Sequence, residues 1–219
     1  MPSHTEENYL KAIFSLNESG IGATTNAIAE KLETKASSVS DMLKRLKEKK
    51  LIHYKKYQAV NLSEEGKKVA ISIIRKHRLW EYFLVEKLHF KWDEVHEIAE
   101  QLEHIQSTEL TDKLDSYLEH PKMDPHGDPI PDKNGNFPMK LSETLDECLS
   151  EATAIIIGVK DHSSNFLSYL DRLNIELGTE VLIKSINAFD KSIEISIEKA
   201  PAITISNEVA KNLFIRLKT

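Results

Sequence analysis

The sequence predicts an α+β protein, with helices over roughly the first two-thirds of the chain and a small β-barrel over the rest. Three observations support this fold class. Apolar residues recur at helical spacing as far as about residue 118, prolines concentrate within residues 120–138, and runs rich in β-branched residues follow. With 219 residues, 40% of them hydrophobic, the chain is long enough to form two or three small cores.

The N-terminal part predicts a helix-turn-helix followed by a short hairpin. Apolar side chains at helical spacing predict a first helix over residues 6–17, and Thr25 is the expected N-cap of a second helix over residues 27–32. A short turn then leads into a third helix over residues 36–50. The segment LIHYKKYQAVNL, residues 51–62, is rich in β-branched and aromatic residues, so we expect a hairpin that forms a wing.

The middle of the chain is predicted to be helical and to mediate self-association. Ser63 starts a long amphipathic helix that extends to about Leu88, and two shorter helices are expected over residues 93–104 and 107–118. Their apolar stripes are too extensive for one small helical unit, so we expect a homodimer. The proline-rich segment 120–138 should form a loop, because proline interrupts both helices and strands.

The last third of the chain carries strand-like runs around short helical patterns, which predict the small β-barrel. These runs cover residues 154–159, 180–186, 193–197 and 203–205. The predicted domains are therefore residues 1–66, 67–138 and 139–219.

Charge and cysteine content narrow the classes of function. The formal net charge is −6, yet residues 35–58 carry eight Lys or Arg against two acids, whereas residues 80–120 carry eleven acids against three lysines. Cys148 is the only cysteine, which excludes an intramolecular disulfide and a multi-thiolate zinc site. The sequence has no apolar run of membrane-spanning length and no secretory signal, so we expect a cytoplasmic protein without a membrane partner.

The basic third helix is a candidate DNA-binding element. Small hydroxyl side chains and free backbone N–H groups gather at its N-terminus, where they can hold phosphates or reach base edges in a major groove. The candidate residues are Lys35, Ser37, Ser38, Ser40 and Lys44. The alternative interpretation is a capped surface helix with a solvated run of charge.

Imidazole and carboxylate side chains form a second constellation. The spacing of His96, Glu100, Glu103 and His104 is expected to place all four on one helical face, and His77 and Glu81 form a second pair four residues apart. Such donors suit manganese, iron(II), zinc or cobalt. A solvated acidic face remains the alternative. The proline-rich loop adds two further candidate ligands, Asp124 and His126, although Asp-Pro is also an ordinary turn starter.

The usual enzyme signatures are missing from the sequence. The segment HEIAE, residues 96–100, resembles the zinc-protease pattern but has Glu where the second His belongs. Neither a phosphate-binding loop nor a Gly-x-Ser-x-Gly elbow occurs, and nothing near Cys148 in the sequence marks it as a nucleophile. We therefore expect a protein that is not an enzyme and has no small organic substrate.

Several segments together resemble the diphtheria toxin repressor family, including its manganese-responsive branch. The resemblance spans essentially the whole chain. The matching segments are TEENYLKAIFSL, IAEKLETKASSVSDMLKRL, LIHYKKYQAVNLSEEGKKVA, RKHRLWEYFL, EHIQSTEL and HPKMDPHGDPIP. This resemblance implies a winged helix-turn-helix, a helical dimerisation domain, a proline-rich loop and an SH3-like barrel, in that order.

The resemblance also implies two metal sites. The first lies between the first helix and the dimerisation helices. Its matching positions are Asn8, His77, Glu100, Glu103 and His104. Lys11 stands where some manganese-responsive members carry a second acid. The second site matches Glu81, His96, Asp124 and His126, with Asp161 or His162 added from the barrel.

The resemblance implies Mn(II) as the first choice of metal and Fe(II) as the second, while Zn(II) or Co(II) can substitute. Glu100 favours manganese, because iron-sensing members carry Cys at that position. Asn8 offers only its amide oxygen, which makes a weaker ligand than an acid. We therefore expect a metal-activated repressor of metal homeostasis genes that binds double-stranded operator DNA as a homodimer. A metal-dependent hydrolase with a vestigial DNA-binding domain and a winged-helix regulator of an organic ligand are the alternatives.

Overall fold

The computed structural model describes residues 2–55, 58–138, 143–197 and 200–218. Two compact units make up the chain, and helices α4, α5 and α6 contribute residues to both. The first unit comprises Met1–His77, Glu100–Lys113 and Pro131–Asn136, and the second comprises Arg78–Ala99, Leu114–Ile130 and Phe137–Thr219. The α+β class is confirmed. Within the described ranges, no helix is both long and apolar enough to span a bilayer.

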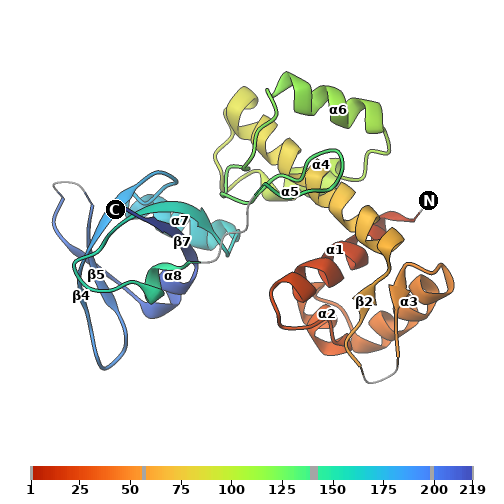
Figure 1. Cartoon of the computed structure of the whole chain (residues 1–219), viewed down its shortest axis with the longest axis horizontal. Coiled ribbons are helices and arrows are strands. Elements are labelled where there is room, and N and C mark those ends of the chain that lie inside the picture. The colour runs from red at the N-terminus through yellow and green to blue at the C-terminus, as the bar shows by residue number, and fades with distance from the viewer. Residues whose placement is uncertain (1, 56–57, 139–142, 198–199, 219) are drawn as a thin grey trace. The chain divides into compact units, whose positions relative to one another are not determined.

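The first unit begins with the predicted helix-turn-helix and wing (Figure 1). Its elements are α1 (His4–Glu18), α2 (Thr25–Lys31), α3 (Ala36–Glu48), β1 (Ile52–His53) and β2 (Asn61–Leu62). The two short strands pair antiparallel, as expected for a wing. Leu10, Ile28 and Leu43, one from each helix, are fully buried, and α2 packs against both α1 and α3.

Helix caps explain where α1 and α2 begin. Ser3 and Glu6 form a reciprocal capping box at the start of α1. The expected cap of α2, Thr25, is wrong by one residue, because the Thr24 side chain accepts the Ala27 N–H at 3.1 Å. Thr25 is the first helical residue instead.

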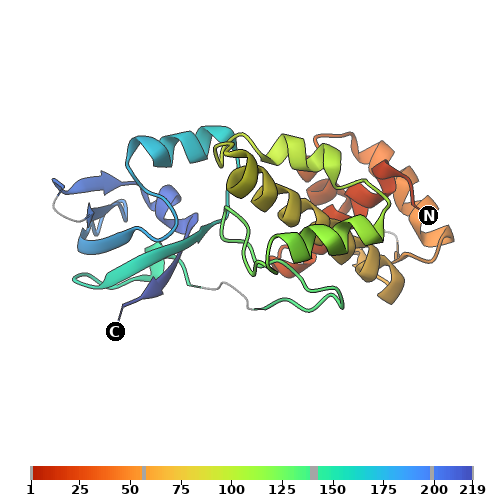
Figure 2. The same ribbon diagram turned by 90° about the horizontal axis from the view of Figure 1, so that it is seen from above.

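Three further helices follow the wing: α4 (Glu64–Leu88), α5 (His96–Leu102) and α6 (Thr108–Tyr117). Figure 2 shows α4 as the long helix that leads out of the N-terminal elements. Helix α5 is shorter than the predicted range 93–104, because the first residue of that range bonds to the later helix α7 (Ser164–Arg172) and the last two residues form a turn. Ser164 and Ser168 bind the Asp93 backbone and side chain, while Glu103 and His104 follow the last turn of α5.

The C-terminal part of the second unit is a five-stranded antiparallel sheet in the order β6-β5-β4-β3-β7. The strands are β3 (Thr153–Val159), β4 (Glu180–Ile186), β5 (Ile193–Ile197), β6 (Ile203–Ile205) and β7 (Leu213–Leu217), with helices η1 (Leu145–Glu147), α7 (Ser164–Arg172) and α8 (Asn207–Lys211). Strand β7 was not predicted, because Leu213–Leu217 carries the charged Arg216 among its apolar residues and is completed by pairing with β3. Buried Ile156, Leu167 and Ile195 lie in the hydrophobic core formed by this sheet and its helices.

The proline-rich loop is ordered by side-chain to backbone hydrogen bonds. Asp124 Oδ1 accepts the backbone N–H groups of His126 and Asp128, both at 2.9 Å. Gly127 lies between them with φ +85°, and its backbone packs directly on Ile157 and Gly158 of β3.

We expect Gly127→Ala to lower the free energy of unfolding by roughly 1–3 kcal/mol more than Gly178→Ala does. Both glycines have a positive φ, so either substitution should add backbone strain of about 1 kcal/mol. A Cβ at Gly127 would also overlap the Ile157 carbonyl, whereas the space around Gly178 is open. Urea unfolding of both variants measures the difference. Equal losses would show that the loop does not pack closely against β3.

Candidate functional site

The first cluster joins α1 to the segment that follows α5, and all its members belong to the first unit. Its members are Glu7, Lys11, His77, Glu100, Glu103 and His104. Glu103 lies at its centre with a side chain that is 0% exposed. Lys11 Nζ lies 2.7 and 2.8 Å from the two Glu103 carboxylate oxygens, and His77 Nδ1 lies 2.7 Å from Oε2. Lys11 also reaches Glu100 Oε1 at 3.3 Å.

Glu7 forms the other half of this cluster, although the sequence analysis did not select it. Its Oε2 lies 2.7 Å from His104 Nδ1, and its Oε1 accepts the Gln106 amide at 2.9 Å. The His104 ring stacks on His4, with centroids 4.5 Å apart. The sequence signal that could have identified Glu7 is its position: it is an acid one residue before Asn8, on the buried side of an amphipathic helix.

Two features of the first cluster indicate what it can bind. Burial alone would raise the pKa of Glu103, but the hydrogen bond from His77 and the charge of Lys11 hold it below the ordinary value. The carboxylate therefore stays ionised. The Asn8 Oδ1 atom, one residue after Glu7 on α1, is buried and accepts no hydrogen bond from the described residues, so α1 offers a further acceptor.

The second cluster lies in the second unit and combines α4, the proline-rich loop and the start of the barrel. Glu81, Asp124 and His126 are all buried and offer ligand atoms within 4.8 Å of one another. His96 Nδ1 lies 3.1 Å from Glu81 Oε1, and His126 Nδ1 lies 3.3 Å from Glu81 Oε2. The His162 ring stacks on His126 with centroids 4.6 Å apart.

Burial and neighbouring charge shift the pKa values of this second cluster strongly. Burial, together with the charges of Glu81 and Asp128, raises the pKa of Asp124 to about 8. Burial would lower the pKa of His126, but the hydrogen bond and charge of Glu81 raise it to about 9. Burial lowers the pKa of His162 to about 4. Such shifts arise where several ionisable groups share a site with little water.

The structure separates residues that the sequence analysis placed on one helical face. His96 contacts Glu81, whereas Glu100 and Glu103 contact Lys11, and His104 contacts Glu7. The expectation of a single helical face is wrong for Glu103 and His104, because α5 ends at Leu102 and both residues lie in the turn that follows.

The two barrel candidates for the second cluster are also placed differently. Asp161 accepts the backbone N–H of Ser163 at 2.8 Å, next to the start of α7. His162 instead stacks on His126 and meets the His96 ring edge-on at 6.1 Å. Of the two candidates, His162 is the one that contacts the cluster.

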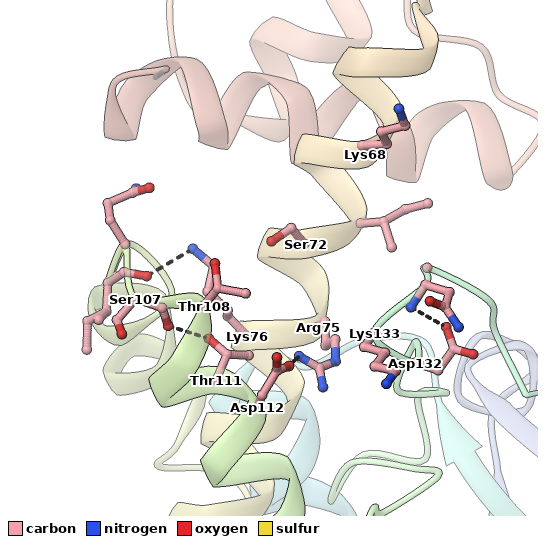
Figure 3. Close-up of a pocket in the computed structure, with 15 residues that line it drawn as sticks. Lys68, Ser72, Arg75, Lys76, Ser107, Thr108, Thr111, Asp112, Asp132 and Lys133 are labelled. Atoms are coloured by element: carbon pink, nitrogen blue, oxygen red, sulfur yellow. Dashed lines mark hydrogen bonds and ion pairs between the residues drawn. The ribbon is translucent and has the colours of Figure 1, made fainter.

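A polar cavity of about 530 Å³ lies between α4, the turn before α6 and the loop at residues 132–135 (Figure 3). Arg75 pairs with Asp112 at 3.1 Å, and Lys76 Nζ donates to the Ile105 carbonyl at 3.3 Å. None of the predicted metal ligands lines this cavity. Its buried cations are held by neighbouring protein groups.

The N-terminal turn of α3 presents the DNA-binding candidates. Lys35, Ser37 and Ser38 are exposed, and the N-cap position makes no side-chain hydrogen bond, so first-turn N–H groups remain for an outside acceptor. Ser40 is only half-buried, and its hydroxyl donates to the Ala36 carbonyl. Lys44 is exposed and pairs with Asp41 at 2.9 Å.

Helix α1 contacts both the first cluster and α3. Glu6 pairs with Lys49, directly after α3, at 2.8 Å. A second cavity of about 470 Å³ lies between the two helices, and Asn8 and Ser38 both line it. The Glu6–Lys49 ion pair therefore links α1 to the end of α3.

Family models match three consecutive parts of the chain. Residues 1–60 match "Iron dependent repressor, N-terminal DNA binding domain", and residues 63–132 match "Iron dependent repressor, metal binding and dimerisation domain". Residues 143–217 match the FeoA domain. The predicted order of winged helix-turn-helix, helical domain and SH3-like barrel is confirmed.

Named relatives agree with these models. The iron-dependent repressor IdeR of Mycobacterium bovis is 35% identical over 127 residues, which are 58% of this chain and 55% of the relative. The chain thus spans about half the length of the curated relatives it matches. A solved manganese-dependent transcriptional repressor in complex with manganese is 31% identical, with a TM-score of 0.89 over 97% of this chain and 100% of the other.

A second solved structure, the manganese regulator SloR, is 31% identical with a TM-score of 0.82 and covers 97% of this chain and 98% of its own. An identity of 31% with TM-scores of 0.89 and 0.82 over nearly the full length of both chains indicates common ancestry. The chain belongs to the iron-dependent repressor family, which includes the diphtheria toxin repressors.

Proposed function

We propose that this protein is a DNA-binding transcriptional repressor of metal-ion homeostasis, activated by Mn(II) or Fe(II). The observation that carries the proposal is the first cluster, in which buried carboxylates and imidazoles join α1 to the segment after α5. The same helix is tied to α3 through Glu6 and Lys49. Ligand binding at the cluster is thereby coupled to the DNA-facing helix.

The residues of the first cluster fit a divalent transition metal. Glu103 is ionised, and His77 and His104 supply imidazole nitrogens. On α1, the buried Asn8 amide oxygen accepts no hydrogen bond from the described residues. Cys148, the only thiol, is buried in the core of the barrel, so the ligands at this cluster are nitrogen and oxygen. That donor set suits Mn(II) and Fe(II), and Co(II) or Zn(II) can substitute.

The names of the relatives support the same metals. The matched repressors are described as iron-dependent or manganese-dependent, and one solved relative, ScaR, is described with bound Zn²⁺. Glu100 adds a carboxylate to the set, which favours Mn(II) over softer metals. We assign Asn8, His77, Glu100, Glu103 and His104 to this site, with Glu7 as an addition from the structure.

The second cluster also has the donor chemistry of a metal site. Glu81, Asp124 and His126 are buried together, and Asp124 Oδ2 accepts no hydrogen bond from the described residues. Arg78 Nε is its charged neighbour, at 3.7 Å. We assign Glu81, His96, Asp124 and His126 to a second metal site and replace Asp161 by His162.

Activation follows from the charges on α1 and its neighbours. A divalent cation would supply the positive charge that holds Glu100 and Glu103 together with the oxygens of α1. Glu7 and Asn8 then fix α1, and the Glu6–Lys49 pair fixes α3 relative to α1. Two α3 helices in a dimer would gain a defined separation for successive major grooves. Because it would act on operator DNA, we propose that the protein is located in the cytoplasm.

Exposed apolar residues on α4 and α6 support the homodimer. Leu110 and Tyr117 lie two turns apart on α6, so they share one helix face, and Tyr117 is 64% exposed. Leu88, at the end of α4, is exposed as well. Aromatic residues of this kind frequently anchor protein–protein interfaces.

We expect His104→Ala and Glu103→Gln each to weaken Mn(II) binding by about 100-fold or more, because each removes a donor or a charge from the cluster. Calorimetric titration with Mn(II) and Fe(II), paired with operator-binding assays, measures the effect. His120→Ala is the control, since that exposed imidazole pairs with Asp115. Wild-type affinity and activation in both cluster variants would refute the assignment.

Lys44→Ala should weaken binding to any DNA sequence and reduce the slope of log K against log salt concentration by about one, since it removes one phosphate contact. Ser37→Ala should instead relax the preference for operator over random DNA, with a cost of about 1 kcal/mol at one base pair. Titrations at several salt concentrations separate the two effects. Identical behaviour of both variants would contradict these separate roles for Lys44 and Ser37.

Tyr117→Glu should raise the dimer dissociation constant by about 100-fold, because it would bury a charge in the proposed interface. Phe189→Glu is the matched control, since Phe189 is 94% exposed on the turn between β4 and β5 and should leave association unchanged. Sedimentation equilibrium with Mn(II) present measures both. A fully dimeric Tyr117→Glu variant would exclude this face from the interface.

A further inference from the structure

We propose that Lys11 is a built-in cation that occupies the first cluster when no metal is bound, and that it thereby sets the metal concentration at which the protein responds. This inference rests on the proposed function, because it concerns the regulation of the same site. It assigns a role to a residue that is itself unable to bind a metal while it is protonated.

The contacts of Lys11 place its ammonium where a bound cation would compensate the carboxylates. Nζ lies 2.7 and 2.8 Å from the two oxygens of Glu103 and 3.3 Å from Glu100 Oε1. His77 lies beside the same Glu103 Oε2 at 2.7 Å. Both Glu103 oxygens are therefore engaged, and a metal gains a full share of them only if the ammonium leaves.

The burial of the two partners explains why the ammonium can be exchanged. Glu103 is 0% exposed, and an ionised carboxylate there requires a compensating positive charge. Lys11 is 22% exposed on the surface of α1, and its flexible stem allows the ammonium to swing into water. The fixed partner is buried, whereas the mobile partner has access to solvent.

Metal binding is then an exchange of one cation for another. The observed metal affinity equals the intrinsic metal affinity of the empty site multiplied by the fraction of molecules in which Lys11 has left the carboxylates. In the metal-free protein, the same contact holds α1 against the segment after α5. Removal of Lys11 should therefore have two opposite effects: a less stable metal-free protein and tighter metal binding.

A purely structural ion pair makes a different prediction. If Lys11 only stabilises the fold, its loss lowers the stability of the metal-free protein and leaves metal affinity unchanged or weaker. The sign of the change in metal affinity therefore distinguishes the two roles.

The experiment compares the full-length wild type with Lys11→Met by calorimetric titration with MnCl₂ and by thermal melting without metal. We expect Lys11→Met to bind Mn(II) at least about tenfold more tightly and to melt at a lower temperature when metal-free. Lys31→Met is the matched control. Burial lowers the pKa of Lys31, and the charge of nearby Lys11 lowers it further. This control therefore removes an equal charge near Lys11 and keeps the Lys11–Glu103 contact.

Lys11→Arg provides a second test that does not depend on how well Lys11→Met folds. Its guanidinium keeps the charge and can bind a carboxylate through two N–H groups, so it should leave the cluster less readily. The expected order of Mn(II) affinity is Lys11→Met above wild type above Lys11→Arg. Any other order, or an equal gain in Lys31→Met and Lys11→Met, would overturn the role of Lys11.

The outcomes also separate this inference from the proposed function. Mn(II) binding by the wild type with an unchanged affinity in Lys11→Met would overturn the role of Lys11 alone. Absence of binding in all variants would overturn both. Binding by Lys11→Met where the wild type binds weakly or not at all would support the built-in cation directly.

Discussion

The buried carboxylate of Glu103 is the constraint on which the arrangement of the first unit depends. A carboxylate removed from water must be compensated, because an unpaired buried charge costs several kcal/mol, on the order of a whole domain's stability. Lys11 comes from α1 and His77 from α4, so compensation brings three distant segments together. The charge therefore organises the tertiary structure around itself and leaves a site for which a divalent cation is a natural ligand.

The second cluster also contains buried carboxylates, but different groups compensate their charge. Here Glu81, Asp124 and His126 are all buried, and the pKa values of Asp124 and His126 are raised, which reduces the net negative charge of the group. Arg78 adds a positive charge on one side, and the Asp124 Oδ1 atom is satisfied by backbone N–H groups. Protonation and backbone hydrogen bonds thus stabilise the second cluster, whereas a lysine ammonium stabilises the first.

Helix α1 makes two sets of polar contacts, one with the first cluster and one with the end of α3. Glu7 and Lys11 belong to the first cluster, while Glu6 pairs with Lys49 after α3. A capping box defines where the helix begins, so these residues have fixed positions along it. Under the proposed function, a change of cation at the cluster would reach α3 through α1, by way of the Glu6–Lys49 pair and of α2, which packs against both helices.

The sequence by itself determined the elements and the kinds of chemistry: the helices from apolar periodicity, the wing from β-branched residues, and nitrogen and oxygen ligands from a single cysteine. Periodicity describes one element at a time, so it could not show that α5 ends before Glu103 or that His96 and Glu103 have different partners. Glu7, Lys11 and His162 reach their clusters only through packing between segments far apart in sequence. These contacts were determined only by the tertiary structure. The compensation of a buried charge depends on which side chains meet in space, and the spacing of residues in the sequence does not specify those meetings.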